Sequence, residues 1–139
     1  SSAASDVYKR QELGGRVHAL GALPHDAIIQ LLAQADAYCL PTEYAEGFPT
    51  TLLEAAACCC PIVTTRTAGT GELLPGEDYA IFLSDAGTDA IRAGLAALLA
   101  DPAAAQARAE NAYQNLCSHF TWQAVFATMM EVVKSAKRS

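Results

Sequence analysis

The sequence predicts an α/β protein whose mostly parallel sheet is flanked by helices. Short apolar runs, some rich in β-branched residues, alternate with longer segments in which apolar residues recur every three or four positions. Proline and glycine separate many of these segments. Parallel strands need long crossover connections, usually helices, so this alternation indicates βαβ units.

The predicted strands are short apolar runs that end at residues unsuited to a sheet. Gly21 closes the first, Pro41 closes the second, and the third, Ile62-Val-Thr-Thr65, is β-branched throughout. The four predicted strands cover residues 16–21, 37–40, 62–65 and 79–83. Four strands form a small sheet, as we expect of a domain whose N-terminal part is missing.

The helices are predicted from start signals and from one-sided apolar spacing. Pro24 and Asp26 open the first helix. Its apolar face is formed by Ile28, Leu31, Leu32 and Ala35. Pro49 opens the second, because proline at the first helical position loses no hydrogen bond, and Pro61 ends it after Cys60. Beyond a Gly-rich turn at 68–71 and a short turn at 72–74, the predicted helices cover residues 89–100, 102–118 and 121–134.

The composition indicates a soluble globular chain with enough residues for one domain. Its 139 residues carry a net charge of −6 with a pI near 4.9, which argues against a nucleic-acid partner, because clustered Lys and Arg hold such partners. No apolar run approaches the roughly 18 residues of a membrane helix. We interpret the basic tail of Lys134, Lys137 and Arg138 as a solvated helix end, with a peripheral contact to an anionic membrane as the alternative.

The five cysteines fit neither a disulfide framework nor a metal site. Their number is odd, three are adjacent, and neither Cys117 nor His119 has the spacing to complete a ligand set. We therefore expect no metal, and small apolar thiols in a reducing cytoplasm. The cysteines are Cys39, Cys58, Cys59, Cys60 and Cys117.

The first eleven residues need a separate interpretation. Residues 1–11 read Ser-Ser-Ala-Ala-Ser-Asp-Val-Tyr-Lys-Arg-Gln, which resembles the in-frame translation of a transposase-based sequencing adaptor. We predict that they are an artefact and exclude them from the fold. The natural domain is then expected to begin near Glu12, in mid-gene, and to cover residues 12–139.

The most informative segment joins the loop at residues 42–48 to the helix opened by Pro49. In a parallel α/β sheet, ligands bind beside the loop that follows a strand's carboxyl end, and the next helix points its first N–H groups at them. The first turn, Pro49 to Leu52, thus offers unpaired donors and the positive end of a dipole to a diphosphate. Gly47 lets the backbone approach closely.

Glu54 is an acidic residue among apolar neighbours, so its carboxylate needs a polar partner or a cleft. Helical side chains lean toward the N-terminus, which directs Glu54 toward Thr51 and Thr50 and the anion site. A carboxylate there can accept hydrogen bonds from sugar hydroxyls. Glu46, in the loop, is expected on the donor-sugar side of the same pocket. Singly, each of these residues also suits a plain structural role, and their combination favours a site.

Three blocks in order carry a resemblance to a known family. They are Pro41-Thr-Glu-Tyr-Ala-Glu-Gly-Phe-Pro-Thr-Thr-Leu-Leu-Glu-Ala-Ala-Ala-Cys58, Pro61-Ile-Val-Thr64 and Gly69-Thr-Gly-Glu-Leu-Leu74. Together they resemble the C-terminal domain of family-4 glycosyltransferases, with their E-x7-E motif. The similarity runs from about Val17 to Phe120-Thr-Trp122.

The resemblance implies the C-terminal half of a two-domain GT-B fold: a Rossmann-like parallel sheet that binds a nucleotide sugar, with the acceptor mainly in an N-terminal domain. It implies transfer of the sugar to a glycan or lipid-linked acceptor with retention of configuration, and neither a cofactor nor a metal. Because the N-terminal acceptor domain is missing, we expect the chain alone to be inactive.

The resemblance also assigns roles to residues. It implies that Glu46 is the catalytic residue in contact with the donor sugar, and that Glu54 binds the nucleotide ribose. It places the diphosphate on amides near Thr51 and Leu52, and makes Glu72 part of the donor pocket. The implied donor-binding residues are Gly47, Phe48, Thr50, Thr51, Leu52, Glu54 and Glu72.

The sequence departs from the family pattern in two places. Cys59 stands where the family usually has Gly, a position that favours a left-handed turn. The family's first two strands, with a basic residue for the phosphates, should precede Glu12. Two other functions stay open: a non-catalytic α/β binding or regulatory module, and a GT-B epimerase of nucleotide sugars.

Overall fold

The core of the computed structural model is a three-stranded parallel sheet, in the order β1-β2-β3. The structure describes residues 14–44, 47, 49–67 and 69–136. The strands are β1 (Tyr38–Leu40), β2 (Ile62–Thr65) and β3 (Ile81–Leu83). Cys39 is in register with Val63, and Thr64 with Phe82. The parallel arrangement confirms the predicted fold class.

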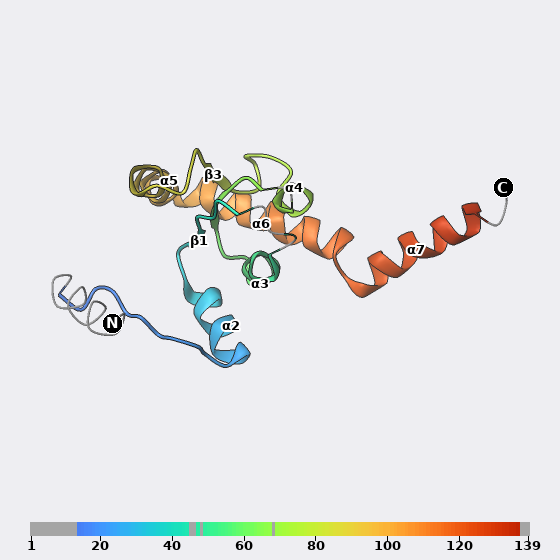
Figure 1. The fold of residues 1–139 in the computed structure, drawn as a ribbon, viewed down its shortest axis with the longest axis horizontal. Helices are drawn as coiled ribbons and strands as arrows, with labels where there is room; N and C mark the ends of the chain where they lie inside the picture. The colour runs from blue at the N-terminus through green and yellow to red at the C-terminus, as the bar shows by residue number, and fades with distance from the viewer. Residues whose placement is uncertain (1–13, 45–46, 48, 68, 137–139) are drawn as a thin grey trace.

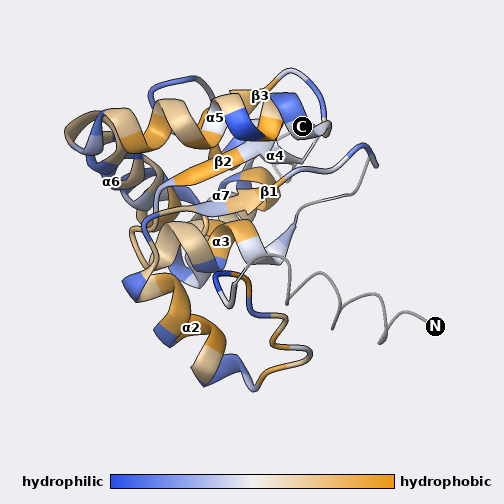
Figure 2. Ribbon diagram, turned by 90° about the vertical axis from the view of Figure 1, so that its left-hand side faces the viewer, coloured by the Kyte–Doolittle hydropathy of each residue, from blue (hydrophilic) through white to orange (hydrophobic). Residues whose placement is uncertain are grey.

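Helices cover both faces of this sheet (Figures 1 and 2). Figure 2 shows α5 on one side of the strands and α2 with α3 on the other. The helices are α2 (His25–Gln34), α3 (Thr50–Ala57), α4 (Thr70–Leu73), α5 (Thr88–Ala100), α6 (Pro102–His119) and α7 (Trp122–Ala136).

The central strand β2 explains why two faces must be covered. All four of its residues are buried, and neighbouring residues of a strand point to opposite faces. Ile62 packs into a cluster with Leu52 of α3, whereas Val63 packs into a second cluster with Leu98 of α5. The β-branched run is therefore a strand buried on both faces, as parallel sheets require.

One predicted strand is wrong. Residues 16–20 are irregular and lie outside the sheet, with Val17 49% and Leu20 54% exposed. An apolar run forms a strand only where other elements pack against it, and no element buries residues 16–20 in this way. The last strand also begins later than predicted, at Ile81, because Tyr79 lies in a turn closed by its N–H to the Gly76 carbonyl (3.0 Å). The sheet thus has three of the four predicted strands.

Helix α3 begins and ends one to three residues inside its predicted limits. Pro49 is the N-cap residue and not the first helical one. At the other end, the N–H of Cys59 donates to the carbonyl of Ala56 (3.0 Å), and that of Cys60 to Ala55 (2.9 Å). This pair of bonds is a Schellman motif, which ends the helix before Pro61 can. It requires a left-handed residue, and Cys59 has φ 53°.

Side chains of helix α6 donate hydrogen bonds to backbone carbonyls of α4 and of the segment between α4 and β3. The side-chain amide of Asn115 donates to the carbonyls of Glu72 (3.0 Å) and Leu73 (2.8 Å). One and two turns earlier, Asn111 donates to Asp78 and Arg108 to Glu77. These contacts hold the short α4 in place, although four residues form too little helix to stand alone.

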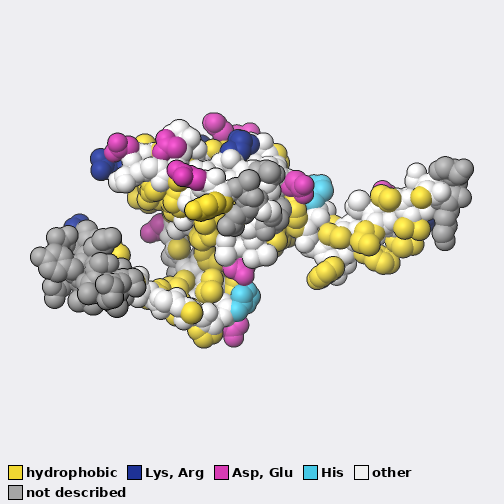
Figure 3. Space-filling model, in the orientation of Figure 1, with side chains coloured by type: hydrophobic (Ala, Val, Ile, Leu, Met, Phe, Trp, Pro, Cys, Tyr) yellow, Lys and Arg dark blue, Asp and Glu magenta, His cyan; other side chains and the backbone are white. Residues whose placement is uncertain are grey.

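Helix α7 projects away from the sheet with its apolar side uncovered (Figures 1 and 3). None of its residues is buried, and Trp122 at its start is 87% exposed. Its other exposed apolar residues are Val125, Phe126, Met129, Met130, Val132 and Val133.

Candidate functional site

The loop that leaves β1 is fixed to β2 by threonine hydroxyls. The hydroxyl of Thr64 donates to the carbonyl of Leu40 (2.9 Å), and the N–H of Thr42 donates to the hydroxyl of Thr65 (3.0 Å). Thr65 in turn donates to the carbonyl of Thr42. These bonds set the direction in which the chain leaves the carboxyl edge of the sheet, where ligands bind in such folds.

The N-terminus of α3 follows this loop. Thr50 and Thr51 are exposed there, whereas the side chain of Leu52 is fully buried in the core. The N–H of Leu52 donates to the Pro49 carbonyl (3.1 Å) and so already has an acceptor. Leu52 therefore anchors the helix, and the exposed first turn is the part that can meet a ligand.

The remaining predicted residues of the loop divide into two groups. Gly47 is exposed just before the helix. Glu46, predicted as catalytic, and Phe48, predicted to bind the donor, lie outside the described residues.

Glu54 lies one turn further along α3 with its side chain 24% exposed. Its Oε1 is 3.1 Å from Nε2 of His25, the first residue of α2. The carboxylate has thus found the polar partner that its apolar neighbours made necessary. Because a carboxylate can only accept, the Nε2 atom carries the hydrogen.

Tyr38 of β1 lies beside Thr51 and Glu54. Burial raises the pKa of Tyr38 above its usual range, a hydrogen bond with the Thr51 side chain opposes this rise, and the nearby charge of Glu54 adds to it. Neither His25 nor Tyr38 was among the predicted site residues. No sequence signal links either to Glu54, since only the packing of β1, α2 and α3 brings them together.

Glu72 stands apart from this group, on α4. Its side chain is exposed, and its carbonyl accepts the bond from Asn115 described above. The start of α4 is held by Thr70, whose hydroxyl donates to the Thr67 carbonyl (2.9 Å) and accepts from the Thr67 N–H (3.0 Å). The structure thus collects Thr50, Thr51 and Glu54 on one helix and leaves Glu72 on another.

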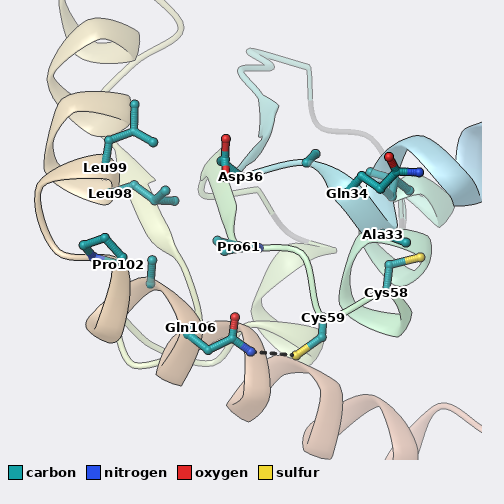
Figure 4. A pocket seen from close by; sticks show the side chains of 13 residues that line it. Ala33, Gln34, Asp36, Cys58, Cys59, Pro61, Leu98, Leu99, Pro102 and Gln106 are labelled. Carbon is teal, nitrogen blue, oxygen red and sulfur yellow. Dashed lines mark hydrogen bonds between the residues drawn. The ribbon is translucent and has the colours of Figure 1, made fainter.

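Two hollows mark opposite edges of the sheet. A groove of about 530 Å³ at the carboxyl edge is lined by the chain that follows each strand, including Tyr44, Arg66 and Asp85. A second hollow of about 280 Å³ lies where the strands begin, between Pro61, Leu98 and Cys59 (Figure 4). The second hollow is therefore on the wrong edge to be the predicted donor site.

The described residues contain neither a cluster of metal ligands nor a membrane-spanning helix. Within residues 14–44, 47, 49–67 and 69–136, no group of three or more His, Cys, Asp or Glu side chains could hold a metal ion. In the same ranges, every helix is too short or too polar to cross a bilayer.

Curated relatives share much of this chain. The chain is 39% identical over 119 residues to the glycogen synthase of Mycobacterium tuberculosis, which covers 86% of the chain and 28% of that enzyme. It is 45% identical over 71 residues to the GPI3 subunit of the phosphatidylinositol N-acetylglucosaminyltransferase of Saccharomyces cerevisiae, which covers 51% of the chain and 16% of that subunit. The chain thus spans less than a third of either relative.

Solved structures and a family model agree with these relatives. The fold is similar to that of Anabaena HepE in complex with UDP, with a TM-score of 0.79, 21% identity, and coverage of 95% of this chain and 36% of HepE. The family model of glycosyl transferases group 1 matches residues 5–115, well over half of the chain. The match begins inside residues 1–11, so the adaptor interpretation of that segment stays a prediction. The fold is of the GT-B type, and this chain belongs to the glycosyl transferases group 1 family.

Proposed function

We propose that this chain is the donor-binding half of a retaining, family-4 glycosyltransferase, which transfers a sugar from a nucleoside diphosphate to a glycan or lipid-linked acceptor. The observation that carries the proposal is the pairing of an exposed helix start, at Thr50 and Thr51, with the Glu54 carboxylate one turn away on the same helix. The amides of an exposed helix start can bind a diphosphate, and a carboxylate can accept hydrogen bonds from the hydroxyls of a ribose.

The roles follow from this geometry. The amides of Thr50 and Thr51 bind the diphosphate at the positive end of α3, while Leu52 anchors that turn through its buried side chain. Glu54 accepts hydrogen bonds from the ribose. Glu46 remains our proposal for the catalytic contact with the donor sugar.

Three more residues complete the proposed donor pocket. We assign Gly47 and Phe48, the residues just before Pro49 in the sequence, to the diphosphate side of the pocket. We assign Glu72 of α4 to another side of it. In transfer, the bond from the sugar C1 to the diphosphate oxygen breaks, a bond from C1 to the acceptor oxygen forms, and the proton of the acceptor hydroxyl passes to the leaving diphosphate or to solvent. The leaving diphosphate gains negative charge, which the amides at the start of α3 stabilise.

The relatives support a role within a longer enzyme. Glycogen synthase and the N-acetylglucosaminyltransferase subunit are much longer than this chain, and HepE was solved with UDP. We propose that the acceptor binds mainly to an N-terminal domain, that the donor site needs no metal, and that the 139-residue chain alone has no transferase turnover.

Isothermal titration of the complete enzyme with UDP- and GDP-sugars tests this proposal. We expect one of the two series to bind, and we expect Glu54→Ala to weaken binding about 10- to 100-fold, the range for a lost hydrogen bond to a charged group. Glu131→Ala, which removes an exposed carboxylate on α7, is the matched control and should bind like the wild type.

Two results would overturn the assignment. One is the absence of binding by any nucleotide sugar tested. The other is an unchanged affinity in Glu54→Ala, which would leave this carboxylate without a role in the donor site.

A further inference from the structure

The contact between His25 and Glu54 joins two helices at the proposed ribose site. His25 is the first residue of α2, and its Nε2 lies 3.1 Å from Oε1 of Glu54 on α3. The histidine side chain is 66% exposed and the carboxylate 24% exposed, so the pair lies at the surface and can be reached by a ligand.

The surroundings of Glu54 make this contact the main restraint on its carboxylate. The residues after it, Ala55 and Ala56, are fully buried, and Cys58 one turn later is half-buried. The negative charge of Glu54 also contributes to the raised pKa values of Tyr38 and Cys58, behind the larger effect of their burial. Among the described residues, His25 alone forms an ion pair or hydrogen bond with the Glu54 side chain.

The hydrogen bond uses only part of what the carboxylate can accept. Two carboxylate oxygens offer about four acceptor positions, and the imidazole occupies one of them on Oε1. Oε2 is left to accept from a ligand. Holding one oxygen fixes the rotamer of the side chain, which lowers the entropy lost when the other oxygen binds a hydroxyl.

We propose that His25 is a positioning residue that holds Glu54 ready for the ribose of a nucleoside diphosphate, and that it thereby sets a preference for ribonucleotides over 2′-deoxyribonucleotides. This inference rests on the proposed function, because it needs Glu54 to bind the ribose. His25 acts through Glu54 and does not touch the ligand.

Three substitutions separate the hydrogen bond from the shape of the side chain. His25→Ala removes both, and His25→Phe keeps a ring but has no donor. His25→Gln keeps an N–H donor near the position of Nε2. His18→Ala is the control, since His18 is an exposed histidine outside the helices.

The readout is the ratio of the dissociation constants for 2′-deoxy-UDP and UDP, measured on the complete enzyme, with 2′-deoxy-GDP and GDP if the enzyme binds guanosine. We expect His25→Ala and His25→Phe to weaken UDP binding about 3- to 10-fold, as for one hydrogen bond, and to reduce the ratio by a similar factor. His25→Gln should restore most of the ratio, and His18→Ala should not change it.

A double-substitution cycle shows whether His25 works through Glu54. In the Glu54→Ala background, His25→Ala should cause no further loss of affinity, because the carboxylate that it positions is gone. Thermal melting of each variant establishes that it is folded, and His25→Phe and His25→Gln carry the test if His25→Ala is not.

The outcomes distinguish this proposal from the one on which it rests. If the wild type binds nucleotide and Glu54→Ala weakens binding, but His25→Ala and His25→Phe keep the wild-type ratio, then the positioning role is wrong and the donor site stands. This includes the case in which the variants lose affinity equally for UDP and 2′-deoxy-UDP, because an equal loss leaves the ratio unchanged and indicates a general structural effect. If the wild type binds no nucleotide, both proposals fail.

Discussion

Cys59 ends helix α3 in a left-handed conformation that glycine adopts most easily. A cysteine at the position after the helix, where glycine is usual, indicated a left-handed turn occupied by a residue with a Cβ atom. The structure has Cys59 at φ 53°, at the centre of the Schellman motif that ends α3. This expectation came from the family pattern, because the start and stop signals in the sequence alone extended the helix to Cys60.

The strain at Cys59 leads to a stability prediction. Cys59→Gly should raise the free energy of unfolding by about 1 kcal/mol, because glycine adopts this conformation without the clash of a Cβ atom. Urea denaturation measures the change. Cys58→Gly is the matched control: its φ is −84°, so it has no such strain to release and should lower stability. Equal effects of the two substitutions would contradict the interpretation.

Glu54 shows where single-residue reasoning stops. The apolar neighbours of Glu54 predicted that its carboxylate needs a polar partner, and the structure provides His25. The identity of that partner could not be predicted, because the two residues are 29 positions apart and meet only when α2 packs on α3. Glu46 and Phe48 lie outside the described residues, and their roles stay predictions.

Among the elements, the capping signals predicted the start of α6, whereas one of the apolar runs did not form its predicted strand. Helix α6 begins at Pro102, as predicted, and the Asp101 side chain caps it by accepting from the Ala104 N–H (3.0 Å). The predicted strand at residues 16–21 was supported by its apolar character and the closing Gly21, and it is irregular. Capping is decided by neighbours in sequence, whereas a strand depends on partners that are distant in sequence.

Gly94 illustrates a packing requirement that helix propensity does not show. It lies inside α5, where glycine is unfavourable, but a Cβ atom there would lie 2.5 Å from Leu83 Cδ2 and 3.1 Å from Val63 Cγ1. The absence of a side chain therefore lets α5 lie close to β2 and β3. The sequence alone gave no sign of this contact.

We expect Gly94→Ala to destabilise the protein by about 1 to 3 kcal/mol, the usual cost of overpacking, although alanine favours helix. Thermal or urea denaturation is the measurement. Gly71→Ala in α4 is the control: its Cβ would meet no atom within 4 Å, so only the helix preference of alanine acts and stability should not fall. A stabilising effect of Gly94→Ala would contradict this interpretation, because it would show that the side chains of Leu83 and Val63 can move aside at little cost.

At the scale of the whole molecule, the sequence predicted the layers better than it predicted the surface. The alternation of strands and helices was enough for a parallel sheet covered on both faces. It was not enough to place Trp122, a large apolar residue that is exposed on α7. Apolar character predicts that a side chain tends to be buried, but it does not say which surface buries it.

Several elements of the fold meet at the carboxyl edge of the sheet. Threonine hydroxyls on β2 direct the loop after β1, α3 starts beside that loop, and α2 brings His25 to Glu54. We propose that this edge binds a nucleoside diphosphate through the start of α3 and through Glu54.

This proposal is tested by a crystal structure of the full-length protein with bound UDP, or with GDP if it binds guanosine. We predict that the diphosphate lies within hydrogen-bond distance of the amides of Thr50 and Thr51, and that a ribose hydroxyl donates to Oε2 of Glu54 while His25 keeps its bond to Oε1. A diphosphate bound elsewhere, or a Glu54 side chain that points away from the nucleotide, would show that the proposed donor site is wrong.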